Sequence, residues 1–472
     1  MAEVMEPSRT ASAATYLDET TRRLFPLRLT PFESYMLLDR SPDTWMLFLI
    51  QMHMEGTVDR AALAESVAFA CSRHPLSVAT IQSGWWGRRC WTLDQNRQPA
   101  ILWTTGGAVP AEWHRPPDLT RESGVRVLIE QRDGEATITL QFHHAVCDGV
   151  ASGQWMEDML AWYARLTGPE DTAPVPVEIQ PERLIDRRRH RGKAYRGSEW
   201  MRQCVLQLAE FFGRIPRPLH TPAVPPPPAE QDFAGLVSHF LSLEETHELR
   251  RATQRAGVTL NDWLLRDLFK SIAAWNVADA KSWRSNPWYR VNMPMSLRER
   301  ADVATPATNL VSLTFLNRRR SAVLSGNAQL LEGIAKECGE IRRRRKGTMF
   351  LDTLAIIDAV PGLMRMILGL PVCLSTGALT NLGDPCRRFT ARFPRRDGFI
   401  QVGNLIVRNF GGAPTLRRNT HVAMAVNTYR NRITLNLQMT PGLFGRADVE
   451  RFMKLYVAQI QAALAESNGA AT

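Results

Sequence analysis

The chain of 472 residues lacks the cysteine arrangement of a disulfide-rich domain or of a structural zinc site. Its seven cysteines are scattered and contain no CxxC pair: Cys71, Cys90, Cys147, Cys204, Cys338, Cys373 and Cys386. An odd number without regular spacing argues against a disulfide framework and fits the reducing cytosol. The first 25 residues also lack the apolar core of a secretory signal peptide. We therefore expect a cytoplasmic protein.

No uninterrupted apolar run is long enough to cross a membrane, which takes about 20 residues. The most apolar stretch, residues 354–379, is broken by charged residues and prolines at Asp358, Pro361, Arg365 and Pro371. We expect this stretch to form core or the wall of a tunnel. A helix lying on a membrane surface, beside the basic run 342–346, is the alternative and would make the protein membrane-associated.

Charged residues of both signs are common, and basic residues outnumber acidic ones. Lys plus Arg number 58 against 47 for Asp plus Glu, a formal charge of +11, which favours anionic partners. The arginine runs at 187–191, 318–320 and 342–346 are interpreted as solvated faces or as a patch for coenzyme A phosphates, an acidic carrier protein or anionic lipid. No nucleic-acid-binding motif accompanies them, so we expect no nucleic acid partner.

Hydrophobic residues make up 44% and charged residues 22%, which is globular composition. The length suggests about two to four domains. Residues 1–20 are small and polar, and we expect a disordered tail. A proline-rich, basic crossover at 181–232 separates an N-terminal lobe at 21–180 from a C-terminal lobe at 233–472.

Strand and helix signals alternate in both halves. Residues 125–130 and 136–142 predict two strands, and the Asp133-Gly134 dipeptide predicts the hairpin turn between them. Helical spacing predicts helices at 59–73 and 152–166. The fold class is therefore α/β, with a site expected between the two halves.

The sharpest chemical signal follows the second of these strands, at His143-His144-x-x-x-Asp148-Gly149. A neutral imidazole held at a strand end can accept a proton near pH 7. A pair of buried histidines is the structural alternative. Adjacent strand residues point to opposite sides, so a shared metal ion is disfavoured and no metal site is expected. A nucleophilic Cys147 is conceivable, but no GxSxG elbow accompanies it.

These residues resemble the HHxxxDG acyltransferases, which include chloramphenicol acetyltransferase-like enzymes, nonribosomal peptide condensation domains and wax ester synthase/diacylglycerol acyltransferases. Further segments resemble the family's motifs, closest to the wax ester synthase branch, and occur in the family's order. They are Leu29-Thr30-Pro31-Phe32-Glu33, Leu38-Asp39-Arg40, Arg73-His74-Pro75, Val258 to Leu265, Met293 to Arg298, Asn309 to Ser312, and Thr380 to Pro385.

The resemblance implies two chloramphenicol acetyltransferase-like lobes with mixed sheets, flanking helices and an active-site tunnel at their interface. It implies that His144 is the general base and that His143 helps to shape the site. Asp148 is then structural, pairs with Arg298, and stands beside Gly149. The segments that carry Asn309, Ser312, Asn381 and Gly383 are expected at the substrate pocket.

The implied function is transfer of an acyl group from a thioester to an alcohol, forming an ester, with acyl-CoA as the expected donor. No bound cofactor is expected, since the acyl-CoA or phosphopantetheine thioester is a substrate. Condensation with an amine or alcohol, fed by an acyl carrier protein, is the first alternative. The absence of an Asp-Phe-Gly-Trp-Gly segment disfavours it. A non-catalytic domain that binds a partner is the second alternative.

Overall fold

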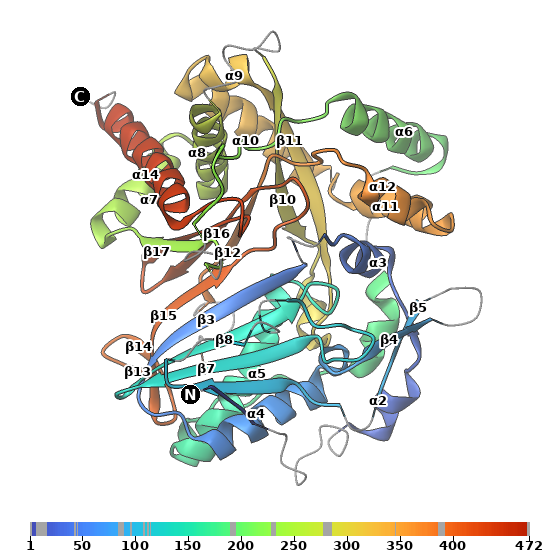
Figure 1. Cartoon of the computed structure of the whole chain (residues 1–472), viewed down its shortest axis with the longest axis vertical. Helices are drawn as coiled ribbons and strands as arrows, with labels where there is room; N and C mark the ends of the chain where they lie inside the picture. The colour runs from blue at the N-terminus through green and yellow to red at the C-terminus, as the bar shows by residue number, and fades with distance from the viewer. Residues whose placement is uncertain are drawn as a thin grey trace.

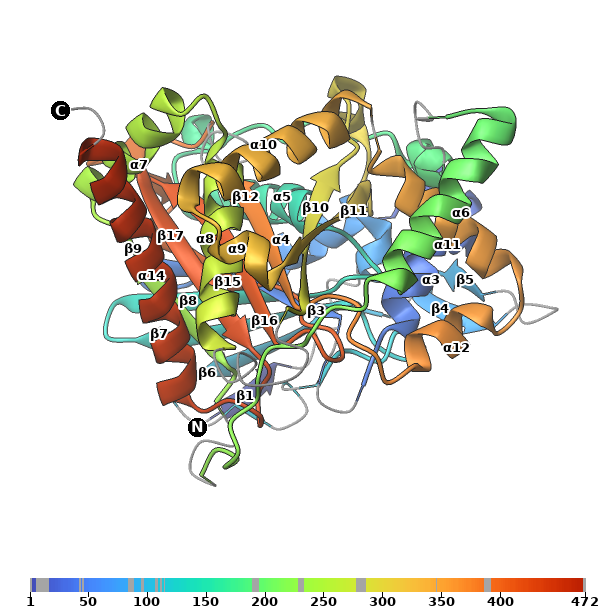
Figure 2. The ribbon, with the colours of Figure 1, turned by 90° about the horizontal axis from the view of Figure 1, so that it is seen from above.

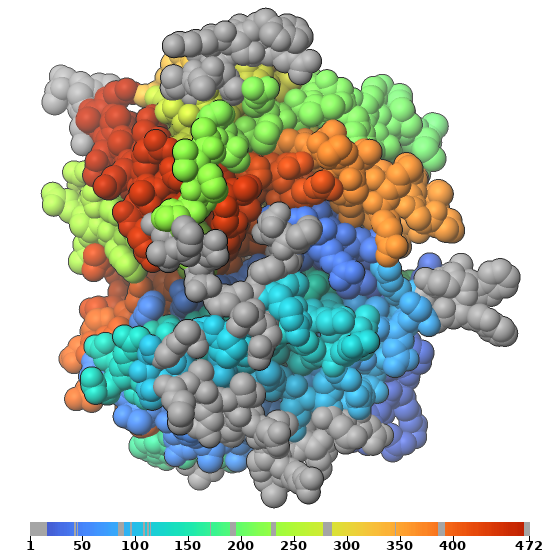
Figure 3. Space-filling model, viewed as in Figure 1, coloured from blue at the N-terminus to red at the C-terminus, as the bar shows by residue number. Residues whose placement is uncertain are grey.

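The computed structural model describes residues 2–5, 17–41, 44, 46–83, 89–94, 97–106, 109–110, 113, 115–188, 195–227, 233–276, 286–344, 346–385 and 392–469. Two mixed sheets, each with its own helices, form two lobes (Figure 1). In the space-filling view the lobes meet along a seam across the middle of the molecule (Figure 3). The expected α/β fold with two lobes is confirmed.

The larger sheet belongs mostly to the N-terminal half. Its eight strands are, in spatial order, β1 (Ala2–Met5), β6 (Ala100–Thr104), β7 (Val125–Arg132), β8 (Glu135–His143), β3 (Leu47–Glu55), β15 (Leu405–Ala413), β14 (Phe399–Val402) and β13 (Arg395–Arg396). The long helices α4 (Arg60–Arg73) and α5 (Gly149–Thr167) cover one face of this sheet (Figure 1).

The second sheet belongs to the C-terminal half. Its strands are, in order, β11 (Val311–Arg319), β10 (Trp288–Ser296), β12 (Gly377–Gly383), β16 (Val422–Tyr429), β17 (Arg432–Met439) and β9 (Leu236–Phe240). Its outer face is covered by α7 (Leu243–Arg255), α8 (Leu260–Trp275), α10 (Asn327–Arg343) and α14 (Arg446–Gly469) (Figure 2). The short α9 (Arg320–Leu324) follows β11.

Smaller elements flank the seam. A small sheet has three strands, in the order β2 (Leu27–Arg28), β5 (Arg89–Thr92) and β4 (Thr80–Ser83). Along the chain, β2 lies between the helices α2 (Glu19–Arg23) and α3 (Pro31–Leu38). Helices α6 (Gly197–Gly213), α11 (Thr348–Ala359) and α12 (Leu363–Gly369) group beside α3 in both ribbon views. The 3-10 helices are η1 (Pro75–Ser77), η4 (Glu170–Thr172), η5 (Pro181–Arg188) and η8 (Arg300–Ala304).

Local sequence signals account for several of these elements. Asp133 and Gly134 both have positive φ, at 36° and 80°, so they form the tight turn that a two-residue hairpin requires. Thr30 and Glu33 form a capping box at the start of α3, with Pro31 in its first turn. Asp59 caps α4 through a hydrogen bond from the Ala62 amide.

The expected disordered tail at 1–20 is wrong for the residues described there. Ala2–Met5 pair with β6 as strand β1, and α2 begins at Glu19. The edge strand β6 offers unpaired backbone groups that β1 satisfies. Residues 6–16 lie outside the described part of the chain.

The expected C-terminal lobe at 233–472 also needs correction, because part of it returns to the first lobe. Strand β15 pairs antiparallel with β3, and β14 and β13 extend the same sheet. Ile400 and Val407 lie in the hydrophobic core of the first lobe. The reason is that β3 has β8 on one side only, and β15 satisfies its other edge.

The apolar stretch 354–379 forms the end of α11, helix α12 and the start of β12. Leu354 and Met364 pack into the hydrophobic core, whereas Val360 and Met366 are exposed. Among the described helices, none combines the length and the apolar character that a membrane crossing demands.

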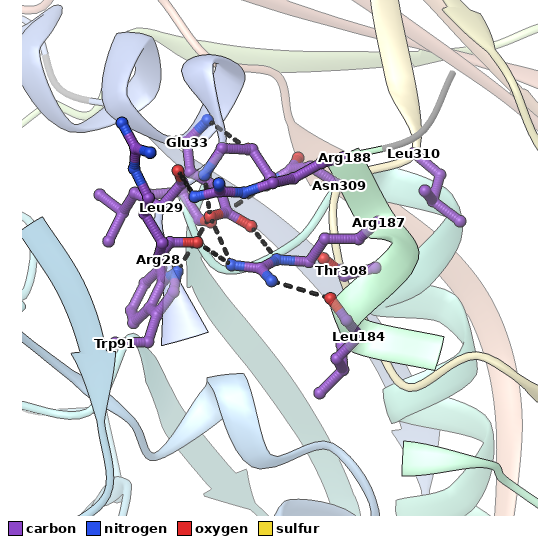
Figure 4. Close-up of polar contacts among 12 residues, drawn as sticks. Arg28, Leu29, Glu33, Trp91, Leu184, Arg187, Arg188, Thr308, Asn309 and Leu310 are labelled. Carbon is purple, nitrogen blue, oxygen red and sulfur yellow. Dashed lines mark hydrogen bonds and ion pairs between the residues drawn. The ribbon is translucent and has the colours of Figure 1, made fainter. Parts of the chain in front are cut away.

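A buried ion pair joins α3 to the crossover (Figure 4). Arg187 donates Nε to Glu33 Oε1 at 2.8 Å and Nη2 to Glu33 Oε2 at 3.1 Å. The same carboxylate accepts the Thr30 amide at 2.8 Å and the Trp91 indole N–H at 3.0 Å. Arg187 also donates to the Leu184 and Arg28 carbonyls, at 2.8 and 2.7 Å. Every charged atom of the pair is therefore compensated inside the protein, as burial demands.

We expect Glu33→Ala to destabilise the protein by about 3–5 kcal/mol, because it leaves the Arg187 charge buried without its partner. Chemical denaturation measures this loss. The control is Glu199→Ala, since Glu199 pairs with Arg202 on the exposed surface of α6 and should change the midpoint little. Equal shifts for the two variants would contradict the assignment of a structural role to the buried pair.

Candidate active site

The HHxxxDG segment lies where the central strand β8 ends. His143 is the last residue of β8, and α5 begins at Gly149, with Asp148 as its N-cap. Strands β7 and β3 pair with β8 on both sides up to this end. The segment is therefore a short, well-anchored turn between a strand and a helix.

His143 holds the turn together. Its Nδ1 accepts a hydrogen bond from the Ala145 amide at 3.1 Å, and its side chain is buried. Burial lowers the pKa of His143 to about 3, with smaller contributions from the nearby His144 and Arg40. The ring is therefore neutral and acts as a fixed acceptor within the turn.

His144 lies at the seam between the lobes and lines the cavity there. Its ring contacts Phe48 and Phe32, with centroids 5.1 and 6.4 Å apart. Its amide donates to the Met46 carbonyl at 2.7 Å, just before β3. Burial lowers the pKa of His144, while its own backbone, Asp148 and Asn309 raise it to a lesser extent. The imidazole is therefore neutral near pH 7 and able to accept a proton.

The Asp148 carboxylate joins the two lobes. Its Oδ1 accepts the Val150 and Ala151 amides of α5, both at 3.0 Å. Its Oδ2 accepts Arg298 Nη1 and the Leu310 amide of the other lobe, both at 2.8 Å. The predicted ion pair with Arg298 is present. Because these four donors occupy the carboxylate, it is not hydrogen-bonded to the His144 ring.

Asn309 completes this contact from the C-terminal lobe. Its Nδ2 donates to the carbonyls of His144 and Ala145, at 2.8 and 3.1 Å. The preceding carbonyl, of Thr308, accepts Arg298 Nη2 at 2.9 Å. Three successive residues of one loop, 308–310, thus fix the motif. Both hydrogens of the Asn309 amide are used there, and His144 Nδ1 has no hydrogen-bonding partner among the described residues.

A cavity of about 170 Å³ lies between the sheets, beside His144 and Gly149. Most of its wall is apolar, with side chains such as Met46, Phe48, Met156, Leu313, Leu379 and Phe410. Its polar lining comes from both lobes: Tyr35, Ser152, Asn292, Thr380, Thr415, Arg417, Thr420, Asn427 and Asn436. A Cβ at Gly149 would lie 2.9 Å from Leu382 Cδ2, so this glycine permits the close approach of β12 to α5.

Two expected pocket residues point elsewhere. Ser312 is fully buried, and its hydroxyl donates to the Gly347 carbonyl. Asn381 is exposed, and its Oδ1 accepts the Gly383 amide at 3.0 Å. Their strand neighbours Leu313, Thr380 and Leu382 line the cavity instead. Successive side chains of a strand alternate between faces, so a motif can mark the right strand and the wrong face.

An ion pair that the sequence analysis missed also borders the cavity. Arg417 donates Nε to Asp39 Oδ2 at 2.8 Å and Nη2 to Asp39 Oδ1 at 3.1 Å. Asp39 stands in a segment singled out in the sequence, but its partner is 378 residues away. No local pattern marks Arg417.

A second cavity, of about 300 Å³, adjoins the motif from the crossover side. Phe32, Arg183, Arg187 and Asn309 are among its lining residues. Since Phe32 contacts the His144 ring and Asn309 contacts its carbonyl, the two cavities share the His144 turn as a boundary.

The alternative of a nucleophilic Cys147 finds little support in the geometry. Cys147 is fully buried, and burial raises the pKa of its thiol well above the ordinary value, so it stays protonated. In the part of the chain that the structure describes, no three His, Cys, Asp or Glu side chains gather as metal ligands.

No family model and no curated protein sequence matches the chain. Solved structures do match. The trichothecene 15-O-acetyltransferase TRI3 of Fusarium sporotrichioides has a TM-score of 0.66 at 12% identity, over 93% of this chain and 94% of that one. The first condensation domain of the CDA synthetase has a TM-score of 0.61 at 14% identity, over 93% and 95%.

A third similar structure is the starter condensation domain of the rhizomide synthetase RzmA, a doubly substituted mutant in complex with C8-CoA and Leu-SNAC. It has a TM-score of 0.61 at 12% identity, over 93% of this chain and 94% of that one. At these identities the similarity establishes the fold: the chain has the two-lobed architecture of these acyltransferase and condensation-domain structures.

We expect Asp148→Ala to destabilise the protein by about 3–5 kcal/mol, because Arg298 and three amides lose their shared acceptor. Asp148→Asn keeps an oxygen for the helix cap and should cost less. Thermal unfolding of both variants measures the difference. An unchanged melt in Asp148→Ala, together with full activity, would refute the structural role of this aspartate.

Proposed function

We propose that this protein is an acyltransferase that moves an acyl group from a thioester to an alcohol, with His144 as general base. One observation carries the proposal. A neutral histidine on a rigid turn lines a cavity between two lobes, and the whole fold matches that of acyltransferase and condensation-domain structures.

The position of the ring supports Nε2 as the reacting atom in this proposal. Nδ1 of His144 is buried, so Nε2 is the nitrogen that can receive a proton from a substrate in the cavity. Nε2 takes the hydroxyl proton as the acceptor oxygen attacks the thioester carbonyl. The carbon–sulfur bond then breaks, and the proton passes from the imidazolium to the departing thiolate. An ester and a free thiol result, and His144 is again neutral.

In this proposal the remaining motif residues position the base. His143 and Asn309 fix the turn through its backbone. Asp148, Arg298 and Gly149 hold the loop between the lobes at its place on α5. Holding both substrates beside a fixed base supplies much of the acceleration. Asn381 and Gly383 act indirectly in this proposal, because they shape the end of strand β12 beside the cavity.

For the donor we propose acyl-CoA. The net charge of +11 favours an anionic cofactor-like substrate, and a structural neighbour was solved with C8-CoA. We also propose a cytoplasmic location with peripheral membrane contact, which the exposed Val360, Met366 and Leu370 around α12 support. The second candidate is condensation, in which an acyl group passes from an acyl carrier protein to an amine. It is favoured because two of the three similar structures described above are condensation domains.

The decisive assay is thiol release from a panel of acyl-CoAs, with alcohols and amines as acceptors. We expect acceptor-dependent release that falls by about 10²–10⁴-fold in His144→Ala, because the base is lost. Cys147→Ala should retain activity, since its buried thiol takes no part. Release that depends only on acylated carrier proteins would favour the condensation candidate. Equal rates in His144→Ala and the unaltered protein would refute the base assignment.

The pH dependence follows from the burial of His144. Its pKa is below the ordinary 6.5, and only the neutral ring accepts a proton. We therefore expect kcat/KM to stay constant down to below pH 6.5 and to fall only as pH passes through the lowered pKa. A pH–rate profile with an acid midpoint above 6.5 would contradict this environment for the base.

A further inference from the structure

A third, smaller hollow adjoins the cavity beside His144. It is lined by residues of α6, α11 and α12, which group together in the ribbon views (Figures 1 and 2). We call this hollow, of about 80 Å³, the side pocket. Its apolar wall consists of Leu208, Phe211, Phe212, Phe315, Phe350, Leu354, Ile357, Met364, Ile367, Leu368 and Leu374. Tyr35, Asn292 and Arg417 line both the side pocket and the cavity beside His144. The two spaces are therefore neighbours that share one boundary.

An aromatic row leads from this boundary into the side pocket. The Tyr35 ring meets Phe350 edge to face, with centroids 5.8 Å apart. Phe350 meets Phe315 at 5.4 Å, and Phe315 meets Phe211 at 5.0 Å. Such contacts make a firm apolar wall that keeps its shape without a ligand.

Two other polar side chains of the side pocket, Thr353 and Ser375, already have hydrogen-bonding partners. Thr353 donates to Gln207 Oε1 at 3.3 Å. The Ser375 hydroxyl bonds to the carbonyls of Arg290 and Gly377, at 3.2 and 2.7 Å. Water would find few partners there, so a hydrocarbon group gains more than water does by filling the space.

At the boundary that the side pocket shares with the cavity beside His144, by contrast, one polar atom lacks a hydrogen-bonding partner among the described residues. Arg417 is only 7% exposed, and Asp39 takes its Nε and Nη2. Its third nitrogen, Nη1, is buried and has no hydrogen-bonding partner among the described residues. A buried guanidinium nitrogen without an acceptor is costly, and a ligand oxygen at the boundary would satisfy it.

We propose that the side pocket binds the hydrocarbon chain of a substrate, whose nearest oxygen accepts a hydrogen bond from Arg417. The inference rests on the proposed function for the identity of that substrate: the acyl chain of the donor or the chain of an alcohol acceptor. Both present the same chemistry, an apolar tail attached to an oxygen-bearing group. The consequence is selection by chain length at a distance from the base.

The test uses equilibrium binding to the full chain, with no transfer required. Isothermal titration compares octanoyl-CoA with acetyl-CoA, and octan-1-ol with ethanol. We expect octanoyl-CoA or octan-1-ol to bind at least about tenfold more tightly than its short counterpart, because each buried methylene adds to affinity. The arm that shows the preference identifies the source of the chain.

Two adjacent residues of α12 supply a matched pair of variants. Ile367 lines the side pocket, whereas Met366 is 61% exposed and takes no part in its wall. We expect Ile367→Phe to remove most of the chain-length preference and Met366→Phe to keep it. If Ile367→Phe fails to fold, Ile367→Ala tests the same wall by enlarging the pocket, which should shift the preference to longer chains.

The outcomes separate this proposal from the proposed function. No chain-length preference in either arm, or equal effects of the Ile367 and Met366 variants, would overturn the side-pocket proposal even if thiol release is observed. A preference that Ile367→Phe abolishes supports the side pocket even if no acyl transfer is found, and the proposed function would then be the one to fail.

Discussion

The candidate site depends on one carboxylate that is shared between the lobes. Asp148 caps α5 with one oxygen and receives Arg298 and the Leu310 amide with the other. A buried charge of this kind is tolerated only when all of its partners are in place. The turn that carries His144 is therefore fixed only when the C-terminal lobe is docked. A neighbouring contact, from the Ala307 amide to His74 Nδ1 at 2.8 Å, ties the same loop to the end of α4.

The residue proposed to react with the substrate is distinct from the residues that hold it in position. His144 is the residue of the HHxxxDG segment whose ring lines the central cavity. The side chains of His143 and Asn309 bond to backbone groups around it, and Asp148 bonds to backbone amides and to Arg298. Burial, which lowers the pKa of His144, keeps the ring neutral, and the apolar wall of the cavity maintains that burial. The cavity thus contributes to the proposed chemistry as well as to substrate binding.

Short-range signals predicted much of the fold. The Asp133-Gly134 turn, the Asp59 cap and the HHxxxDG turn all depend on residues close in sequence. The resemblance to the acyltransferase family also predicted Arg298 as the partner of Asp148. What the sequence could not supply is long-range: the return of β15 to the first sheet and the partners of Glu33 and Asp39, which lie 154 and 378 residues away. The motif on β12 also did not predict which of its alternating side chains face the cavity: Thr380 and Leu382 do, whereas Asn381 does not.

The return of β15 has a consequence for how the chain is made. Glu55 on β3 and Arg408 on β15 contact each other, although 353 residues separate them. At about 5–20 residues per second, β3 leaves the ribosome on the order of 20–70 seconds before its partner strand. During that time the edge of β3 has no β15 to cover it, and an uncovered edge strand invites pairing with other chains. The topology thus leaves one edge of the nascent first sheet without its partner strand until synthesis nears its end.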